Sequence, residues 1–564
     1  MEGEENYIGR VVGIYGRNLL RIAVSDEKLH LVAKPGTYLK LGSVDGSTLY
    51  AMVMGFNLID ELYRKGRIVE EIEGYLNIAF SRNEVSAIIV GYLDNGIIYK
   101  GVKSLPRPGE KVYLAETKEL QEIMGRGELE IGTLSYNPEV KFSLYTNMLA
   151  SRHMAILAMT GAGKSNTVAV LLAQLAEKMK FPRIIVIDTH SEYVPLQSLF
   201  PDKVRVFTPS GRIKKLVEAR YGVSPSPLEI PLWTLGFNEI IGLLRLPYQA
   251  TKQQLYLRNT LQEIRRKRWN NASADDPIYF SIQELKKAVT DMASRHQSDR
   301  SAIDLQLKVD NLIDNPDLYF ITQPEISEEI YRKIEYDEPH RSGKAFVRIY
   351  ERLFSPGINI IALGGLPSEV QISTVSTILK AIWRIVNAYS QAGSKLPLFI
   401  IVEEAHIYSP RDRENPSKEI LEKIAKEGRK FGIGLGIVSQ RPRELSPTLL
   451  AQCGTLIALR TSNPEDQRHI LNSMEEVMTE LIQSLSGLSV GEAIVSGPSA
   501  PLPAIVKIYN FQEIYNVELG GKDINWTKEW NKEPEETDIL PFLFTHEERK
   551  LFERKQEGLD KFFK

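Results

Sequence analysis

A chain of 564 residues is too long for one hydrophobic core, and its 43% hydrophobic and 25% charged residues are ordinary values for a folded protein. The single cysteine, Cys453, excludes an internal disulfide framework. No apolar run approaches the roughly 18 residues of a membrane span. We therefore expect a cytoplasmic protein without membrane attachment. The net charge of −2, from 70 basic and 72 acidic residues, gives no support for nucleic-acid binding, although composition does not reveal positive charge gathered in a pore.

Residues 1–115 carry short β-rich runs separated by turns. Asp94-Asn95-Gly96 is a hairpin signal, and Pro106-Arg107-Pro108-Gly109 marks another turn. This pattern predicts a small N-terminal β-barrel. Since the segment holds no cluster of titratable residues, the simpler interpretation is a packing module without chemistry of its own. Residues 116–150 follow as a connector.

Beyond the connector, apolar strands alternate with helical stretches. This alternation predicts an α/β fold with a mostly parallel sheet covered on both faces, over residues 151–210 and 351–510. Between these two segments, residues 211–350 are rich in helix formers and charges and predict a helical insertion. Residues 511–564 are charged and predict a C-terminal arm. The predicted strands of the core are 153–159, 183–188, 359–363, 398–402, 434–439, 455–460 and 492–495, and the first core helix is 165–178.

The strongest local signal is a glycine-rich segment between an apolar strand and a helix. Glycines let the backbone fold closely around phosphate oxygens, and the helix directs its N-terminal N–H groups toward them. We expect Lys164 to reach the β- and γ-phosphates of ATP, and Ser165 to ligate Mg²⁺. Ala158 stands where the usual pattern has glycine, and a small residue still permits the turn. The predicted nucleotide-binding residues are Thr160, Gly161, Ala162, Gly163, Lys164, Ser165 and Asn166.

The glycine-rich segment and the helix 165–178 together form a phosphate cradle, and the next predicted strand, 183–188, ends in Asp188. This carboxylate could join the magnesium shell, and it could equally cap the next turn of the chain. We keep both roles open.

A basic and aromatic cluster, Arg265-Arg266-Lys267-Arg268-Trp269, ends a predicted helix of the insertion. It could form a phosphate-binding face with a stacking tryptophan. The simpler interpretation is a solvated helix end, because cations are favoured near a helix C-terminus.

A phosphate cradle alone also suits a kinase or a switch GTPase, and a second strand discriminates between these classes. The apolar run 399–402 ends in Glu403 and Glu404, which places two carboxylates at the carboxyl edge of the sheet. We assign Glu403 to magnesium and Glu404 to the general base that accepts a proton from the attacking water, although the two roles could be reversed. Cradle and acidic pair together predict a RecA-like P-loop NTPase core that uses ATP and Mg²⁺.

Two further residues are candidates for contact with the γ-phosphate. Gln440 ends the next strand and could sense this phosphate or position water. Arg429 lies just after a predicted helix and could stabilise transition-state charge from a neighbouring subunit. From spacing alone, an ordinary surface arginine is the simpler interpretation.

With these residues in place, the chain resembles the HerA family of hexameric ATPases, relatives of the FtsK-type DNA translocases. Two departures are Ala158 in place of glycine and Thr189 where proline is expected. The segments that carry the resemblance are Ser151-Arg152-His153 through Lys164-Ser165-Asn166-Thr167, Ile187-Asp188-Thr189-His190-Ser191-Glu192-Tyr193, Val402-Glu403-Glu404-Ala405-His406, Glu427-Gly428-Arg429-Lys430-Phe431-Gly432, Ser439-Gln440-Arg441-Pro442 and Asn463-Pro464-Glu465-Asp466-Gln467.

The resemblance implies a homohexameric ring with ATP between subunits and double-stranded DNA threaded through the pore. It also implies a nuclease partner of the NurA type, the pair acting in DNA end resection during double-strand break repair. By the same resemblance, Arg429 is expected to be an arginine finger, a residue that contacts the γ-phosphate of ATP bound to the neighbouring subunit. Arg152, at the foot of the cradle strand, becomes a second candidate for an intersubunit phosphate contact.

The sequence therefore favours an ATP-driven DNA translocase or helicase. The alternative is an ATP-dependent switch or assembly factor that acts on an RNA–protein or protein partner, which the near-neutral charge and the unfamiliar barrel permit. Oligomer size separates the two, since a stable monomer would count heavily against translocation.

Overall fold

The computed structural model describes residues 6–60, 81–209, 211–247, 249–471, 484–520 and 526–532. Residues 1–5 and most of the predicted C-terminal arm, residues 521–525 and 533–564, lie outside this description. The chain forms two compact units: Met1–Lys178 with Gly436–Ile514, and Met179–Leu435 with Tyr515–Lys564.

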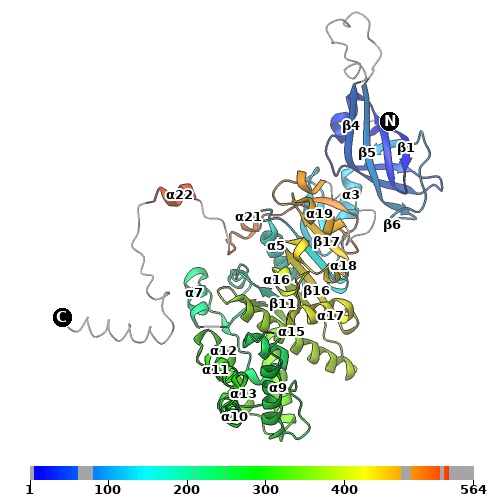
Figure 1. Cartoon of the computed structure of the whole chain (residues 1–564). Helices are drawn as coiled ribbons and strands as arrows, with labels where there is room; N and C mark the ends of the chain where they lie inside the picture. The colour runs from blue at the N-terminus through cyan, green and yellow to red at the C-terminus, as the bar shows by residue number, and fades with distance from the viewer. Residues whose placement is uncertain are drawn as a thin grey trace, which may run out of the picture. The chain divides into compact units, whose positions relative to one another are not determined.

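The first unit begins with the predicted β-barrel, which the structure confirms (Figure 1). Its strands pair antiparallel, and pairing of β2 with β5 closes the ring. Asn95 and Gly96, with φ of 50° and 80°, form the two-residue turn between β5 and β6, as the hairpin signal predicts. The elements are β1 (Tyr7–Tyr15), β2 (Leu19–Val24), α1 (Asp26–Val32), β3 (Tyr38–Gly42), β4 (Thr48–Asp60), β5 (Ser81–Asp94), β6 (Ile97–Lys100) and β7 (Lys111–Leu114).

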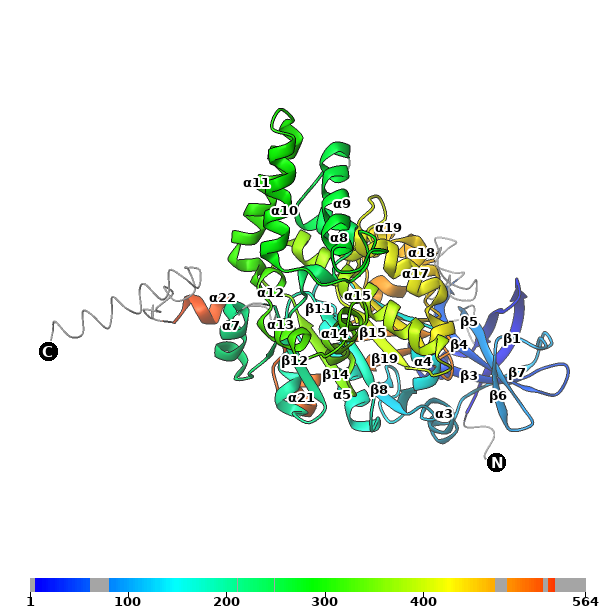
Figure 2. The same ribbon diagram turned by 90° about the horizontal axis from the view of Figure 1, so that it is seen from below.

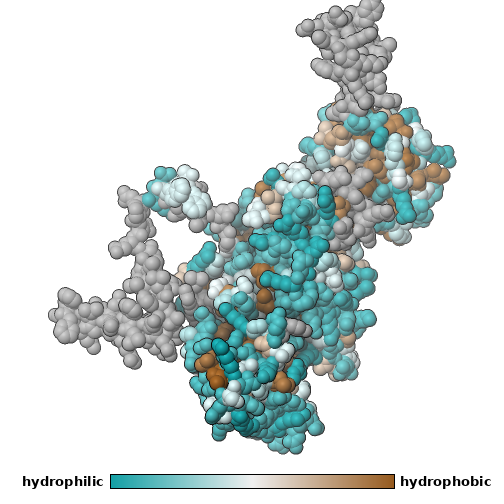
Figure 3. Space-filling view, viewed as in Figure 1, coloured by the Kyte–Doolittle hydropathy of each residue, from teal (hydrophilic) through white to brown (hydrophobic). Residues whose placement is uncertain are grey.

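The barrel interior is apolar, because alternate residues of each strand point inward and are buried. Some apolar side chains also gather on its outer surface, seen as brown atoms over the barrel in Figure 3. Val12, Val44 and Ile97 are each more than half exposed there. No chemistry follows from this surface alone.

The rest of the first unit is a mixed sheet with the cradle helix packed against it. The order is β16-β10-β17-β18-β19-β8-β9, parallel from β16 to β17 and antiparallel beyond. The segment predicted as a connector supplies two of these strands, β8 and β9. The elements are α3 (Thr117–Met124), β8 (Leu129–Leu134), β9 (Lys141–Leu144), α4 (Thr146–Ser151), β10 (Met154–Leu157), α5 (Lys164–Lys178), β16 (Ile433–Ser439), α18 (Pro447–Ala451), β17 (Thr455–Leu459), α19 (Pro464–Leu471), β18 (Glu492–Ser496), β19 (Ala504–Ile508) and α21 (Phe511–Tyr515).

The second unit carries parallel strands in the order β13-β12-β14-β11-β15. Strands β11, β14 and β15 are almost wholly buried, in keeping with the continuous apolar runs of the sequence. The long helix α15 packs against α17 and α8. The elements are β11 (Arg183–Asp188), α6 (Leu196–Leu199), β12 (Val204–Thr208), β13 (Ser226–Pro227), β14 (Gly357–Ala362), α15 (Ser368–Gln391), β15 (Leu398–Val402), α16 (Ala405–Tyr408), α17 (Pro416–Phe431) and α22 (Trp526–Trp530).

The predicted insertion is helical, and Figure 2 shows α9, α10 and α11 side by side. Its helices are α7 (Gly211–Tyr221), α8 (Phe237–Leu243), α9 (Thr251–Arg266), α10 (Ile282–Arg295), α11 (Arg300–Asp314), α12 (Tyr319–Thr322), α13 (Glu325–Arg332) and α14 (His340–Glu351). No helix among the described residues is both long enough and apolar enough to cross a bilayer.

The basic cluster at the end of α9 is only partly a solvated helix end. Arg265 is fully buried and donates to the backbone carbonyls of Trp233 (3.2 Å), Leu235 (2.9 Å) and Ala274. Arg268 pairs with Glu284 at 2.9 and 3.0 Å. The cluster therefore joins parts of the insertion, a role that depends on tertiary neighbours.

Candidate nucleotide site

The phosphate cradle is made mainly by the backbone. Gly161 and Gly163 have φ of 76° and 104°, which side-chain-bearing residues rarely adopt, so the two glycines are required at these turns. The turn is fixed by bonds from Ala162 N to Met159 O (3.2 Å) and from Gly491 N to Ala162 O (3.1 Å). Helix α5 begins at Lys164, which places its N-terminal amides at the loop.

Ala158 is tolerated in place of the usual glycine for a conformational reason. It is not among the residues with positive φ, and it continues strand β10 by donating to Ser439 O at 3.2 Å. Alanine at this position therefore carries no backbone strain.

Gln440 lies beside the cradle. Strands β10 and β16 are parallel neighbours, with Leu157 opposite Ser439, so both strand ends reach the same edge. The hydroxyl of Thr160 donates to Gln440 Oε1 at 3.0 Å. This contact places the amide beside the phosphate loop, and its role as a γ-phosphate sensor stays a prediction.

The side chain of Asn166 makes structural hydrogen bonds. Its amide donates to Tyr509 O at 2.7 Å and accepts from Phe511 N at 2.8 Å. Both ends of the side chain thus tie the first turn of α5 to the segment after β19. The side chain of Asn166 is therefore a structural tie, and a phosphate contact through its backbone N–H stays a prediction.

Arg152 lies at the other end of strand β10 from the cradle. It follows α4, its side chain is exposed, and four strand residues, about 13 Å of chain, separate it from the phosphate loop. Arg152 is thus placed away from the nucleotide loop of its own chain, and its intersubunit phosphate contact stays a prediction.

The acidic strand ends meet in the second unit. Strands β11 and β15 are parallel neighbours with Ile187 opposite Val402, so Asp188 and Glu403 follow at the same edge, and both are fully buried. Burial, and then the charge of Glu403, raise the pKa of Asp188 well above its ordinary value. The Asp188 carboxyl therefore resists ionisation beside Glu403 unless a cation or hydrogen-bond donors lie nearby.

Donors from residues 189–193 surround this pair. Both carboxylate oxygens of Asp188 accept backbone N–H bonds, from Glu192 and Tyr193 at 2.9 Å each. The Tyr193 hydroxyl donates to Glu403 Oε1 at 3.0 Å, and Thr189 Oγ1 donates to the Glu403 carbonyl at 3.0 Å. Burial raises the pKa of Tyr193, so its hydroxyl keeps its proton and stays a donor. The geometry favours the capping role for Asp188 over a place in the magnesium shell.

Glu404 adopts a conformation that is unusual for a residue with a side chain. Its φ and ψ of 48° and 45° are left-handed, at the start of α16, and the residue is buried. His406 Nδ1 lies 3.3 Å from Glu404 Oε2. Strained backbone of this kind concentrates at functional sites, where surrounding structure holds it.

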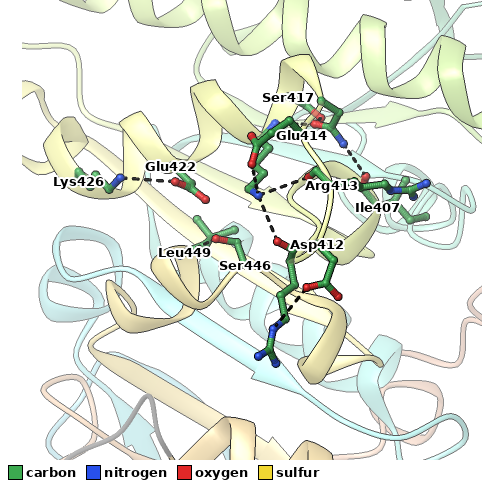
Figure 4. Close-up of polar contacts among 12 residues, drawn as sticks. Ile407, Asp412, Arg413, Glu414, Ser417, Glu422, Lys426, Ser446 and Leu449 are labelled. Carbon is green, nitrogen blue, oxygen red and sulfur yellow. Dashed lines mark hydrogen bonds and ion pairs between the residues drawn. The ribbon is translucent and has the colours of Figure 1, made fainter. Parts of the chain in front are cut away.

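Polar contacts order the loop that follows α16 (Figure 4). Ser417 Oγ donates to Tyr408 O at 2.7 Å, and Asn415 caps α17 by accepting from Lys418 N at 2.8 Å. The buried ammonium of Lys418 pairs with Glu414 at 2.7 Å. The acidic strand end and helix α17 are thereby joined through a fixed connection.

Arg429 lies in the last turn of α17 rather than just after a helix. The helix continues to Phe431 because Gly432, with φ of 86°, supplies the left-handed cap. The Arg429 side chain is exposed, and within the described part of the chain it makes no ion pair. An exposed guanidinium on a firmly capped helix is available to another subunit.

Each of the two units offers an oxygen donor of the kind that magnesium prefers. The described residues include no group of three or more His, Cys, Asp or Glu side chains able to hold a metal by themselves. Mg²⁺ in nucleotide sites is held by one or two protein oxygens and completed by phosphates and water. The Ser165 hydroxyl and the Glu403 carboxylate are oxygen donors of this type.

Sequence reasoning missed three contributors to this region: Tyr193, Thr189 and His406. Each acts on a neighbouring carboxylate or strand end, so neither spacing nor composition marks it. The only available signal was their place in the segments that carry the family resemblance.

Comparison with known proteins identifies the family. VirB4 of Thermoanaerobacter pseudethanolicus aligns with a TM-score of 0.49 and 16% identity over 68% of this chain and 97% of that chain. The family model described as "Helicase HerA, central domain" matches residues 129–382. A probable helicase of Methanocaldococcus jannaschii is 35% identical over 434 residues, 76% of this chain and 75% of the relative. The DNA double-strand break repair helicase HerA of Pyrococcus furiosus is 31% identical over 460 residues, 76% of this chain and 78% of the relative. The chain therefore belongs to the HerA helicase family and is an ATPase of the P-loop class.

Proposed function

We propose that the protein is an ATP-driven DNA translocase or helicase that acts in double-strand break repair. The observation that carries the proposal is its likeness, over three quarters of both chains, to a relative described as a DNA double-strand break repair helicase. The phosphate cradle and the buried acidic strand end support the energy-converting half of this activity. A homohexameric ring around duplex DNA and a NurA-type nuclease partner complete the proposal, on the basis of the family resemblance.

In the proposed reaction, Lys164 neutralises charge on the β- and γ-phosphates of ATP, and Ser165 and Glu403 hold Mg²⁺. Mg²⁺ supplies charge neutralisation on the phosphate oxygens. Glu404 accepts the proton of the attacking water, and Gln440 orients that water or reports the presence of the γ-phosphate.

Residues from a neighbouring subunit complete the site. Arg429 contributes a cation to the transition state, since a rigid guanidinium matches the geometry of the phosphoryl oxygens. Arg152 offers a second phosphate contact across the same boundary. This arrangement makes ATP turnover depend on assembly.

The test is ATPase activity and DNA binding of the assembled protein across a salt series, with blunt duplex DNA as the ligand. We expect duplex DNA to stimulate hydrolysis and binding to weaken as salt rises, because local pore charges release counterions despite the net charge of −2. Lys164→Ala serves as the control that lacks turnover. If the assembled protein neither binds duplex DNA nor responds to it at low salt, the switch or assembly-factor function replaces this proposal.

A further inference from the structure

The buried pair at the ends of β11 and β15 is served by one tyrosine. Tyr193, Asp188 and Glu403 are all fully buried, and Tyr193 contacts both carboxyl-bearing residues through different atoms. Its backbone N–H donates to Asp188 Oδ2 at 2.9 Å, and its hydroxyl donates to Glu403 Oε1 at 3.0 Å. One residue therefore links the two strand ends.

Asp188 fixes where Tyr193 lies. Its second oxygen accepts from Glu192 N at 2.9 Å, so the carboxylate spans two consecutive amides. The chain turns sharply just before these two amides, where Ser191 has a φ of 60°. Ser191 Oγ also accepts from Gly364 N at 3.0 Å, beyond strand β14. The turn is thus held from two strands, which leaves the tyrosine little freedom.

Tyr193 in turn fixes the orientation of the Glu403 carboxylate. The terminal torsion of a carboxylate side chain has broad preferences, and a hydrogen bond to one oxygen narrows them. The backbone of the same residue is held by Thr189 Oγ1 at 3.0 Å and by its own N–H bond to Ile187 O at 3.0 Å. With the backbone already fixed, the tyrosine hydroxyl sets the direction in which the carboxylate presents its oxygens.

We propose that Tyr193 is a positioning residue that orients Glu403 toward the magnesium of bound ATP, and that Asp188 holds Tyr193 in place instead of ligating the metal. This inference rests on the proposed function, in which Glu403 is the carboxylate of the magnesium shell. Hydrogen-bonding partners of metal-ligating carboxylates typically change metal affinity about 10- to 100-fold when they are removed.

The experiment compares Tyr193→Phe with Tyr350→Phe. Tyr350 is also fully buried and also loses one hydroxyl contact, to Thr234 Oγ1 at 2.7 Å in the insertion, with no carboxylate involved. Mn²⁺ binding is measured by electron paramagnetic resonance on the assembled protein with a non-hydrolysable ATP analogue. Thermal melting of each variant accompanies it.

We expect Tyr193→Phe to weaken Mn²⁺ binding about 10-fold and Tyr350→Phe to leave it unchanged. A change of less than twofold for Tyr193→Phe, or an equal loss for Tyr350→Phe, would overturn the proposal. If the wild-type protein binds the nucleotide analogue but no Mn²⁺ at all, the proposed metal site on which the inference rests would be wrong instead.

A double-mutant cycle guards against general loosening of the fold. If Tyr193 acts through Glu403, then Tyr193→Phe should weaken Mn²⁺ binding no further once Glu403→Gln is present. Additive losses would show that the tyrosine acts by another route. Unaltered Mn²⁺ binding by Glu403→Gln alone would show that Glu403 is not in the metal shell, and would overturn the inference as well.

Discussion

The phosphate cradle and the acidic strand end are built by different means. In the cradle, the backbone forms the expected phosphate site: two glycines have φ of 76° and 104°, and the first amides of α5 lie next to them. At the acidic end, buried side chains from two strands are held by a tyrosine and a threonine of the turn that follows β11. The first region tolerates little change in chain conformation, whereas the second depends on the orientation of individual groups.

This difference predicts two kinds of failure. Changes in the cradle should remove nucleotide binding, because no other group replaces a charge-assisted contact to the phosphates. Changes among the residues of the second unit should spare binding and remove hydrolysis, because those groups act on water, metal and developing charge. The predictions that follow test this separation.

The largest selective effect is expected at Arg429. Arg429→Ala should retain ATP binding and ring formation while losing about 10³- to 10⁵-fold in hydrolysis rate, the range found for arginine fingers. Its exposed place on a capped helix means that folding should be unaffected. Steady-state ATPase, nucleotide binding and native mass spectrometry measure the three properties separately.

A mixing experiment decides whether Arg429 acts across the subunit boundary. Lys164→Ala subunits should lack turnover and bind nucleotide weakly, yet they carry an intact finger. Rings that contain both variants can pair an intact cradle with the finger of a neighbour, so some activity should return. Confirmed mixed rings with no more activity than the separate variants would return Arg429 to an ordinary surface arginine.

A smaller loss is expected at the general base. Glu404→Gln keeps the shape of the side chain and loses the proton acceptor, so it should bind ATP and hydrolyse it about 10²- to 10⁴-fold more slowly. Rapid-quench measurement of a single turnover separates this step from product release. If Glu403→Gln binds ATP and hydrolyses it slowly while Glu404→Gln stays active, the two roles are reversed.

The same contrast explains what the sequence could predict. The cradle is one contiguous segment, so its residues and the following helix were predictable from spacing, as were the strands that end in Asp188 and Glu403. Arg265 was misjudged because its burial depends on carbonyls of Trp233 and Leu235, about 30 positions away in the chain. The strands β8, β9 and β19 were missed because they are only six, four and five residues long, and because the pairing that joins β8 to β19 brings together segments far apart in the chain.

Asn166 shows the limit of motif assignment within the cradle itself. It lies in the predicted nucleotide-binding segment, yet its amide is committed to Tyr509 O and Phe511 N at 2.7 and 2.8 Å. Asn166→Ala should therefore lower the free energy of unfolding by about 1–3 kcal/mol, since it removes two hydrogen bonds, one of them from the backbone N–H of the buried Phe511. Nucleotide affinity should stay within about twofold of wild type, because the phosphate-facing backbone is unchanged.

Asn510→Ala is the matched control for this smallest effect. Asn510 lies in the same segment, and its amide also donates once and accepts once, to Glu513 at 2.7 Å and from Gln512 N at 3.1 Å, but its contacts are exposed. Asn510 caps α21 through its contact with Gln512 N, and because this contact is exposed we expect a loss of about 0.5–1 kcal/mol, smaller than that of Asn166→Ala. Chemical denaturation measures both variants, and titration with a fluorescent ATP analogue measures their affinity. If Asn166→Ala instead weakens ATP binding tenfold at wild-type stability, then the Asn166 side chain belongs to the phosphate cradle, as the sequence predicts. The residues whose loss removes nucleotide binding would then extend further into α5.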